Sequence, residues 1–378
     1  MKEDAKREIR VVEHTIFDGF EGVELNGHLY RLACGAQTIE APDGTLICGW
    51  MTGGNSEPAD DHVYVYSRST DGGKTWSEMQ ILDDGGDDNA AAVLFELNGR
   101  LFAMCGRWPV GSDYSTWTYT RKESHDNGLT WTDEVPITFL EGERLSGSFG
   151  NLIHCSNGEI IGCGTSLYRR EKPLAAGVER LIHAKSEEEA AAMPPLQEGE
   201  TKAVTFDETL YGMFAFKTNE DMTEFTILGG VNNRPLGLLE GNIIELEGGR
   251  LTMIMRAEWG GYLWRADSDD FGRTWTPAYP TDIPNPSTLA QVRRLPDGRI
   301  GLFHNPTGGV PGEKGTRHVL SVWLSNDEME SWYIKSDVII GMQNSYPGPL
   351  VLHDGSVAFS YDKGRRLAKY VEVMLPEP

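Results

Sequence analysis

The sequence predicts an all-β fold, a six-bladed β-propeller, and three observations support this prediction. Variants of one octet, Ser-x-Asp-x-Gly-x-Thr-Trp, occur at four places along the 378 residues. Six turn dipeptides that end in Gly separate apolar, strand-like runs. Further strand-like runs lie near the two chain ends, at Ile9–Glu13 and Tyr370–Val373. Hairpins of one kind that recur along a chain are typical of propellers and related arrays.

The octet has a physical role in a hairpin. Its Asp is expected to cap the turn between two antiparallel strands, its Gly to adopt a positive φ, and its Trp to fill the gap below the turn. Three copies are clear and the fourth is more divergent; they are Ser69–Trp76, Ser124–Trp131, Ser268–Trp275 and Ser325–Trp332. A further segment, Thr218–Phe225, fits the same register with Glu220 in the place of Asp and Phe225 in the place of Trp.

The Gly-ending turns set the number of blades. They are Asp43-Gly44, Asn98-Gly99, Asn157-Gly158, Gly248-Gly249, Asp297-Gly298 and Asp354-Gly355. Such a dipeptide between apolar runs is the strongest short-range signal for a hairpin. Four of the five intervals have the size of a four-stranded blade, and the longest, from Gly158 to Gly249, contains an insertion. Six blades follow, and the terminal runs are expected to close the ring and remove free sheet edges.

The insertion, from about 171 to 202, is predicted to be helical. Its run Ser186–Met193 is rich in Ala, Ser186 and Glu189 fit a capping box, and Pro194-Pro195 ends it. We interpret the insertion as a surface excursion between strands of one blade, with a lid or a subunit contact as the alternative. The whole chain, 1–378, then forms one propeller domain.

Composition excludes several function classes. The net charge of −23 argues against nucleic acid or an anionic membrane as a partner. No apolar run approaches the ~20 residues of a membrane span, and the first ten residues lack the apolar stretch of a secretion signal, so a cytoplasmic protein is expected. The five cysteines form no CxxC pair and are expected to be reduced core residues. No metal or other cofactor is predicted, because no cluster has ligand spacing.

Over nearly its whole length the chain resembles the sialidase superfamily, in its BNR-repeat branch, where the octet is known as the Asp-box. The segment Leu239–Arg256 resembles a family strand pair that carries a Glu and then an Arg. The resemblance makes Glu240 the candidate base and Arg256 a candidate clamp for a substrate carboxylate. The segment Gly315–Ser325 resembles the strand of the family's third arginine and assigns that role to Arg317.

Two further segments complete the resemblance. Asn344–Leu350 resembles the segment of the family's nucleophile and points to Tyr346, although Pro follows it here. The loop Glu57–His62 lies where the family keeps its acid/base aspartate, a role that the resemblance gives to Asp60 or Asp61.

The first arginine of the family departs from the pattern. Leu29–Ala33 resembles the family's Tyr-Arg-Ile-Pro segment, but Arg31 lies three residues farther from its Gly turn than the family spacing allows. Cys34 occupies the position in register. A β-bulge could bring Arg31 back to the site. Otherwise the clamp has two arginines, and the substrate is expected to be a different acidic sugar.

The chemistry explains why these residue types occur together. A sialic acid carries a carboxylate on its anomeric carbon, which would repel a carboxylate nucleophile. A neutral tyrosine hydroxyl, deprotonated by Glu as it attacks, avoids this repulsion. Arginine forks recognise the substrate carboxylate, and an Asp protonates the leaving oxygen and then activates water. An acidic chain needs such arginines gathered locally to admit an anionic ligand.

Two functions remain open. The resemblance implies an exo-acting, retaining glycoside hydrolase that releases a terminal acidic sugar. The alternative is a propeller that acts on another acidic glycan, as a uronate lyase or hydrolase, or a carbohydrate-binding protein. The first predicts a hydrogen bond between Glu240 and Tyr346 at the centre, and convergence of Arg256 and Arg317, on equivalent strands of adjacent blades.

Each candidate also has a structural interpretation. On this alternative, the Glu is a turn-end carboxylate, the arginines pair with acidic surface groups, the Tyr is a core aromatic with a satisfied hydroxyl, and the Asp pair belongs to a solvated turn. Further polar residues near predicted strand ends could line the pocket without an assigned role: Asn89, Arg107, Trp108, His304 and Asn305.

Overall fold

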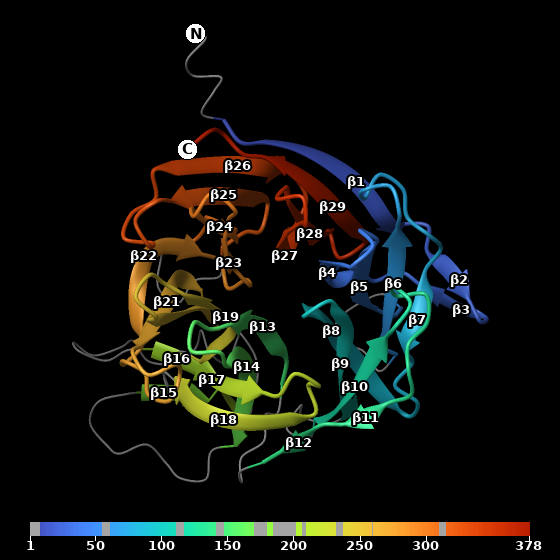
Figure 1. Cartoon of the computed structure of the whole chain (residues 1–378), viewed down its shortest axis with the longest axis horizontal. Helices are drawn as coiled ribbons and strands as arrows, with labels where there is room; N and C mark the ends of the chain where they lie inside the picture. Colours follow the sequence, from blue (N-terminus) through green and yellow to red (C-terminus); the bar gives the residue numbers. More distant parts are fainter. Residues whose placement is uncertain are drawn as a thin grey trace.

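The computed structural model is a ring of six sheets around a central axis (Figure 1). It describes residues 8–54, 61–110, 117–140, 147–169, 180–183, 202–205, 209–231, 237–258, 260–309 and 315–378. The regular elements within these ranges are strands, which confirms the all-β, six-bladed propeller. Within the same ranges, no helix has the length and apolar character needed to cross a membrane.

Each blade is a sheet of four antiparallel strands that follow one another outward from the axis. Blade 1 contains β4 (Cys34–Glu40), β5 (Leu46–Thr52), β6 (Val63–Ser69) and β7 (Gln80–Asp83). Blade 2 contains β8 (Asp88–Leu97), β9 (Arg100–Pro109), β10 (Thr118–Ser124) and β11 (Val135–Pro136). Blade 3 contains β13 (Phe149–His154), β14 (Ile160–Arg169), β17 (Thr209–Thr218) and β18 (Glu224–Val231), with β12 (Thr138–Phe139) added in parallel at its outer edge.

The second half of the ring repeats this pattern. Blade 4 contains β19 (Leu238–Glu245), β20 (Leu251–Ala257), β21 (Gly261–Ser268) and β22 (Tyr279–Asn285). Blade 5 contains β23 (Gln291–Arg294), β24 (Ile300–His304), β25 (Val319–Ser325) and β26 (Ile334–Ile340). Blade 6 contains β27 (Asn344–Val351), β28 (Val357–Lys363), β29 (Leu367–Met374) and, as its outer strand, β1 (Arg10–Asp18). A small hairpin of β2 (Val23–Leu25) and β3 (His28–Tyr30) lies outside the blades.

The two ends of the chain close the ring within one blade. Strand β1 pairs antiparallel with β29, with Val11 opposite Val373 and Glu13 opposite Val371. In Figure 1 the two strands lie side by side at the rim. The terminal runs predicted from the sequence therefore do pair, and β29 has no free edge along this length.

The turns divide the propeller into two ends. All six predicted Gly turns connect the first and second strands of a blade, as in Gly44 between β4 and β5, where φ is 85°. The Asp-boxes connect third and fourth strands. Because strand direction alternates, both sets of turns lie at one end of the ring, which we call the Asp-box end. The first strands of all blades begin at the opposite end, which is where the candidate residues are found.

The Asp-box turns have the expected geometry. In the first copy, Asp71 Oδ1 accepts from Thr75 N at 2.9 Å and Asp71 Oδ2 accepts from Thr75 Oγ1 at 2.6 Å. Gly73 has a φ of 88°, and Trp76 Nε1 donates to its carbonyl oxygen at 2.9 Å. The divergent fourth copy keeps the carboxylate bonds, with Asp327 accepting from the backbone and hydroxyl of a serine.

The segment Thr218–Phe225 of blade 3, which fits the Asp-box register, differs from the prediction in its capping residue. Asn219, not Glu220, caps the turn: its Oδ1 accepts from Thr223 N at 2.9 Å and from Glu224 N at 3.2 Å. Met222 takes the positive φ of the box glycine, at 51°, and Phe225 fills the Trp position and is fully buried. An amide one residue earlier in the chain thus replaces the carboxylate, because both side chains offer the same acceptor oxygen to the turn.

The predicted helical insertion is described only in part. Its described residues form two short parallel strands, β15 (Arg180–His183) and β16 (Lys202–Thr205), which contradicts a helix at those positions. The alanine-rich run Ser186–Met193 lies outside the described residues. The pairing places Arg180–His183, within the insertion, beside Lys202–Thr205 at its C-terminal end.

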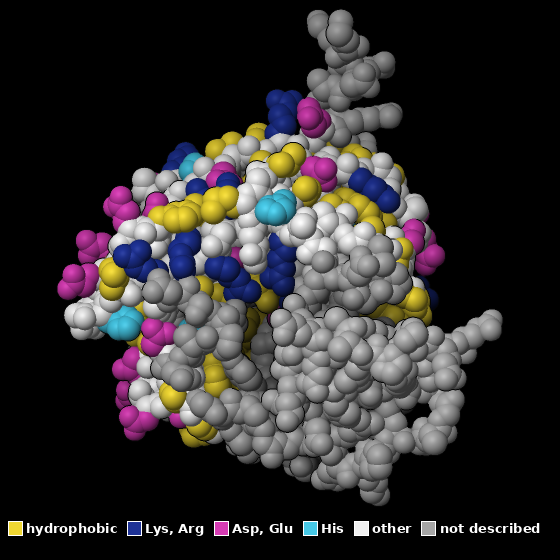
Figure 2. All heavy atoms as spheres, turned by 180° about the vertical axis from the view of Figure 1, so that it is seen from behind, with side chains coloured by type: hydrophobic (Ala, Val, Ile, Leu, Met, Phe, Trp, Pro, Cys, Tyr) yellow, Lys and Arg dark blue, Asp and Glu magenta, His cyan; other side chains and the backbone are white. Residues whose placement is uncertain are grey.

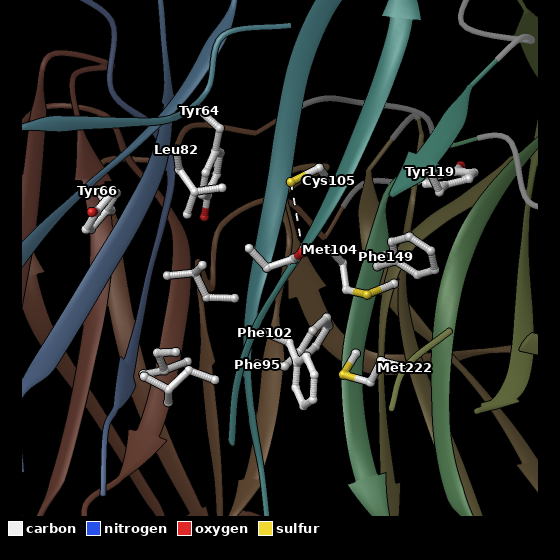
Figure 3. Close-up of a cluster of buried hydrophobic side chains, with 14 of the residues drawn as sticks. Tyr64, Tyr66, Leu82, Phe95, Phe102, Met104, Cys105, Tyr119, Phe149 and Met222 are labelled. Carbon is white, nitrogen blue, oxygen red and sulfur yellow. Dashed lines mark hydrogen bonds between the residues drawn. The ribbon is translucent and has the colours of Figure 1, made fainter. Parts of the chain in front are cut away.

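Aromatic side chains pack the blades against one another. The largest buried cluster, part of which Figure 3 shows, spans blades 1 to 3. Phe102 of blade 2 is fully buried, and Tyr119 of blade 2 meets Phe149 of blade 3 edge to face with ring centroids 5.0 Å apart. Aromatic pairs of this kind contribute about 0.5–1.5 kcal/mol beyond their buried area. This packing fixes the positions of the inner strands and so of the side chains at their starts.

The Asp-box carboxylates predict an acid limit to stability. The Thr75 side-chain hydrogen bond is the main reason that the pKa of Asp71 falls to about 2. A carboxylate whose pKa is lowered by folding stabilises the fold above its unfolded pKa, and this stabilisation is lost as the pH falls through the folded value. The melting temperatures of the wild type and Asp71→Ala should therefore differ most above pH 4 and converge toward pH 2. Lys74→Ala, in the same turn, is the control; a constant gap for Asp71→Ala would contradict the prediction.

Candidate active site

A tyrosine, a glutamate and an arginine meet where the inner strands of blades 4 and 6 begin. The hydroxyl of Tyr346 donates to Glu240 Oε1 at 3.1 Å, the hydrogen bond expected from the sequence. Arg256 Nη1 lies 2.9 Å from Glu240 Oε2 as an ion pair and 3.5 Å from the Tyr346 hydroxyl. The carboxylate therefore lies between a hydroxyl proton and a permanent positive charge.

Two strained β-bulges point these side chains at each other. The register of β19 against β20 shifts between Leu239 and Asn242, and that of β27 against β28 shifts between Ser345 and Gly348. Within the bulges Glu240 has a φ of 48° and Tyr346 a φ of 57°. Left-handed backbone at residues other than Gly costs of order 1–3 kcal/mol each and is typical of functional sites.

Arg256 and Arg317 converge on one point, as expected. Arg256 Nη1 donates to the carbonyl oxygen of Ser287 at 3.2 Å, and Arg317 Nη2 donates to the same oxygen at 2.6 Å. They do not lie on equivalent strands, however: Arg256 is near the end of β20, a second strand, whereas Arg317 precedes β25, a third strand. The convergence arises because the end of a second strand and the start of the next lie at the same end of the ring.

Burial and charge set the protonation of the site. Burial, followed by the charge of Glu240, raises the pKa of Tyr346, while Arg256 and Arg365 act in the opposite direction. Burial alone would lower the pKa of Arg256, but Glu240 and Tyr346 outweigh it and the pKa rises. The tyrosine is therefore neutral and the guanidinium charged at neutral pH. The Nε of Arg256 is buried and has no hydrogen-bond partner among the described residues.

Arg31 does not join this site, so the bulge that could have restored it does not do so. Its Nη1 donates to the carbonyl oxygen of Phe20 at 3.0 Å, in an exposed position. A bulge does occur at the start of β4, but it lies between Cys34 and Gln37, after Arg31. Arg31 precedes both this bulge and β4 itself, and the strand begins with the in-register residue Cys34.

The acid/base candidates are only partly described. Asp60 lies outside the described residues. Asp61 lies in the connection from β5 to β6, at the same end of the ring as Tyr346. Its Oδ2 accepts from Gly54 N at 2.7 Å and lies 3.7 Å from His28 Nε2. Within the described part of the chain, Asp61 makes no hydrogen bond to Tyr346 or Glu240, so a substrate would have to span the distance between them.

Sequence reasoning missed one arginine beside Tyr346. Arg365, in the turn between β28 and β29, places its Cζ 5.0 Å from the centre of the Tyr346 ring, compared with 5.7 Å for Arg317. Its Nη1 also contacts Cys34 Sγ. The linear signal is slight, because Gly364-Arg365 looks like an ordinary hairpin turn; only the closure of blade 6 onto blade 1 brings this turn to the site.

The other polar candidates have structural contacts. His304 is buried against Trp323, with ring centroids 4.5 Å apart, and burial lowers its pKa to about 3. Arg107 pairs with the buried Asp83. Trp108 stacks on the ring of Trp117. Asn305 Nδ2 donates to the carbonyl oxygen of Val319, and Asn89 Oδ1 accepts from His62 N.

Clusters of metal-ligating side chains and the local charge indicate which kinds of ligand the site can bind. In the described ranges, no group of three or more His, Cys, Asp or Glu side chains could hold a metal ion. All five cysteines are buried and unbridged. Figure 2 shows Lys and Arg side chains gathered beside a hollow on one face, although the net charge is −23. Local arginines of this kind suit an anionic ligand.

Comparison with known proteins finds sialidases that are similar to this chain in sequence and in fold. The chain is 24% identical over 233 residues to a sialidase of Clostridium perfringens, an alignment that covers 57% of this chain and 53% of the relative. The chain thus matches about half the length of this relative. Its fold resembles NanB sialidase of Streptococcus pneumoniae, with a TM-score of 0.63, 12% identity and coverage of 91% of this chain and 68% of the other.

The fold also resembles a propeller with a different activity. An α-L-arabinanase of Penicillium chrysogenum, solved with arabinobiose, has a TM-score of 0.58, 15% identity and coverage of 96% of this chain and 97% of the other. Likeness at such identity shows the fold alone. The family model for the BNR repeat-like domain matches residues 44–359. The chain therefore belongs to the BNR repeat-like domain family.

Proposed function

We propose that the protein is an exo-acting glycoside hydrolase that releases a terminal acidic sugar, sialic acid or a similar one, with retention through Tyr346 as the nucleophile. The observation that carries the proposal is the 3.1 Å hydrogen bond from the Tyr346 hydroxyl to Glu240. A carbohydrate-binding protein has no need to hold a neutral tyrosine against a carboxylate on strained backbone.

In the first half of the reaction, the tyrosine oxygen attacks the anomeric carbon while Glu240 takes the hydroxyl proton. The bond from that carbon to the leaving oxygen breaks, and Asp60 or Asp61 gives the leaving oxygen a proton. The neutral hydroxyl approaches the substrate carboxylate without charge repulsion, and the proton transfer creates the nucleophile only as the new bond forms.

In the second half, the same aspartate takes a proton from water as the water oxygen attacks the anomeric carbon. The bond to Tyr346 breaks, and Glu240 returns the proton to the phenolic oxygen. Two inversions at one carbon give net retention. The ion pair with Arg256 holds the Glu240 carboxylate in place beside the Tyr346 hydroxyl, from which it takes the proton.

Arg256 and Arg317 supply the recognition of the carboxylate. Both already point at one carbonyl oxygen, that of Ser287, at 3.2 and 2.6 Å. A substrate carboxylate offers two oxygens with full charge in place of one neutral acceptor, and charge-assisted bonds are roughly twice as strong. The partner of this site is therefore an acidic sugar or glycan.

The position of Arg31 favours a second candidate, a hydrolase or lyase for another acidic sugar such as a uronate. Arg31 bonds to Phe20 and leaves the site without the family's first arginine. A lyase that eliminates across a uronate with a tyrosine–histidine pair needs a histidine beside the tyrosine. Among the described residues, no hydrogen bond or ring contact of Tyr346 involves a histidine, so the hydrolase is the better supported of the two.

Removal of the tyrosine oxygen tests the nucleophile. Tyr346→Phe keeps the ring and its packing, so the fold and the affinity for an acidic-sugar ligand should stay nearly unchanged. Because the nucleophilic atom is gone, kcat on a chromogenic glycoside of the sugar that a substrate screen identifies should fall by roughly 10³-fold or more. Tyr279→Phe, which removes a hydroxyl bonded to Asp267 at the Asp-box end, is the control. Retention of more than a small percentage of the wild-type kcat would rule out Tyr346 as nucleophile.

Exchange of the arginine forks tests carboxylate recognition. Arg256→Lys and Arg317→Lys each keep the charge but lose the planar fork, so affinity for the acidic sugar should fall by about tenfold or more. The methyl ester of the ligand should bind the wild type about as poorly, and should bind the double variant little worse than the free acid does. Arg294→Lys, a fork paired with Glu328 at the Asp-box end, should leave affinity unchanged. An ester that binds the wild type as well as the acid would show that the site does not recognise a carboxylate.

A further inference from the structure

Three inner strands begin with the same bulged backbone, but one of them carries no side chain there. In β19 and β27 the left-handed residues of the bulges are Glu240 and Tyr346, and their side chains meet. In β4 the corresponding residue is Gly35, with a φ of 66°. A Cβ added at Gly35 would meet no described atom within 4 Å. As far as the described residues go, the site therefore has an open space at the position where the two other strands place a functional side chain.

Arg365 lies beside this space. Its Nη1 contacts Cys34 Sγ, and Cys34 directly precedes Gly35. Its Cζ is 5.0 Å from the centre of the Tyr346 ring. The turn that carries it is fixed from both sides: the carbonyl oxygen of Arg365 accepts from Ala33 N at 3.1 Å, and Gly35 N donates to Asp362 Oδ2 at 3.3 Å. Hydrogen bonds between blades 1 and 6 thus hold the turn that carries Arg365 against the start of β4.

We propose that Arg365 and the open space beside Gly35 form a carboxylate subsite, in which Arg365 supplies the third guanidinium that the chain does not obtain from Arg31. The proposal rests on the proposed function, since it names a further group that recognises the same anionic ligand. Sequence position hides this role, because Arg365 comes from the last hairpin of the chain and not from its first blade.

The charges around Tyr346 support an anion at this place. Arg256, Arg317 and Arg365 bring three permanent positive charges to one ring, in a protein whose net charge is −23. Like charges gathered this closely repel one another, and the carboxylates of Glu240 and the buried Asp362 offset part of that repulsion. A ligand carboxylate would offset more of it. Asp362 Oδ1 lies 3.9 Å from Arg365 Nε, a different nitrogen from the Nη1 that contacts Cys34.

Cys34 allows a test that does not depend on turnover. Iodoacetate and iodoacetamide both alkylate the thiolate with loss of iodide, and they differ in that only iodoacetate carries a carboxylate. The ratio of their rates at Cys34, followed by mass spectrometry, therefore reports attraction of a carboxylate and cancels any change in the thiol itself. Arg365→Gln should lower this ratio about tenfold. Arg366→Gln, next in the chain, should leave it unchanged, and Cys34→Ser identifies the modified residue.

Two outcomes would overturn the subsite: the same ratio in Arg365→Gln as in the wild type, or a Cys34 that neither reagent reaches. Calorimetry with 2-deoxy-2,3-dehydro sialic acid separates this inference from the proposed function. Arg365→Lys should weaken binding about tenfold, whereas Arg31→Lys should not change it. Binding that only Arg31→Lys weakens would overturn the subsite and leave the hydrolase standing. If the wild type does not bind this ligand, a sialic-acid function fails, and the alkylation ratio alone decides the subsite.

Discussion

The pairing of β1 with β29 is the interaction on which the rest of the structure depends. Without it blade 6 would have three strands, and the ring would be held only by packing between blades. With it, the last blade contains strands from both ends of the chain, and the turn between β28 and β29 packs against the start of β4. The site lies at this seam: Tyr346 and Arg365 come from blade 6, and Cys34 and Gly35 from blade 1. Closure of the ring therefore also brings the site residues of blades 1 and 6 together.

Much of the fold could be predicted because its turns have recognisable short sequence patterns. A Gly turn or an Asp-box needs a residue type at a fixed place for reasons internal to a few residues, so six blades could be counted from the sequence. The capping residue of the segment Thr218–Phe225 could not be predicted, because Asn219 and Glu220 both offer an acceptor oxygen and only the backbone path decides between them. The insertion was harder still, since helix propensity competes there with strand pairing between residues far apart.

The candidate site was predictable to the extent that each residue begins or ends a strand. Glu240, Tyr346, Arg256 and Arg317 all belong to segments with a recognisable pattern, and the structure brings them together. Arg31 and Arg365 show the limit. A shift of three residues against a turn moves Arg31 out of the bulge, and contact between the first and last blades brings Arg365 in. Both effects depend on three-dimensional register, which no local pattern in one sequence records.

The carbonyl oxygen of Ser287 affects the thermodynamics of ligand binding. A free arginine side chain has about 2 kcal/mol of rotamer entropy to lose when it is immobilised. In this protein Arg256 and Arg317 are already ordered by one shared acceptor, and Ser287 itself is buried on left-handed backbone at a φ of 64°. Binding of an anion then exchanges one acceptor for another and orders little that was mobile. For the function proposed above, the arginine pair would be a preformed receptor, whose selectivity comes from the charge of the incoming acceptor and not from closure around it.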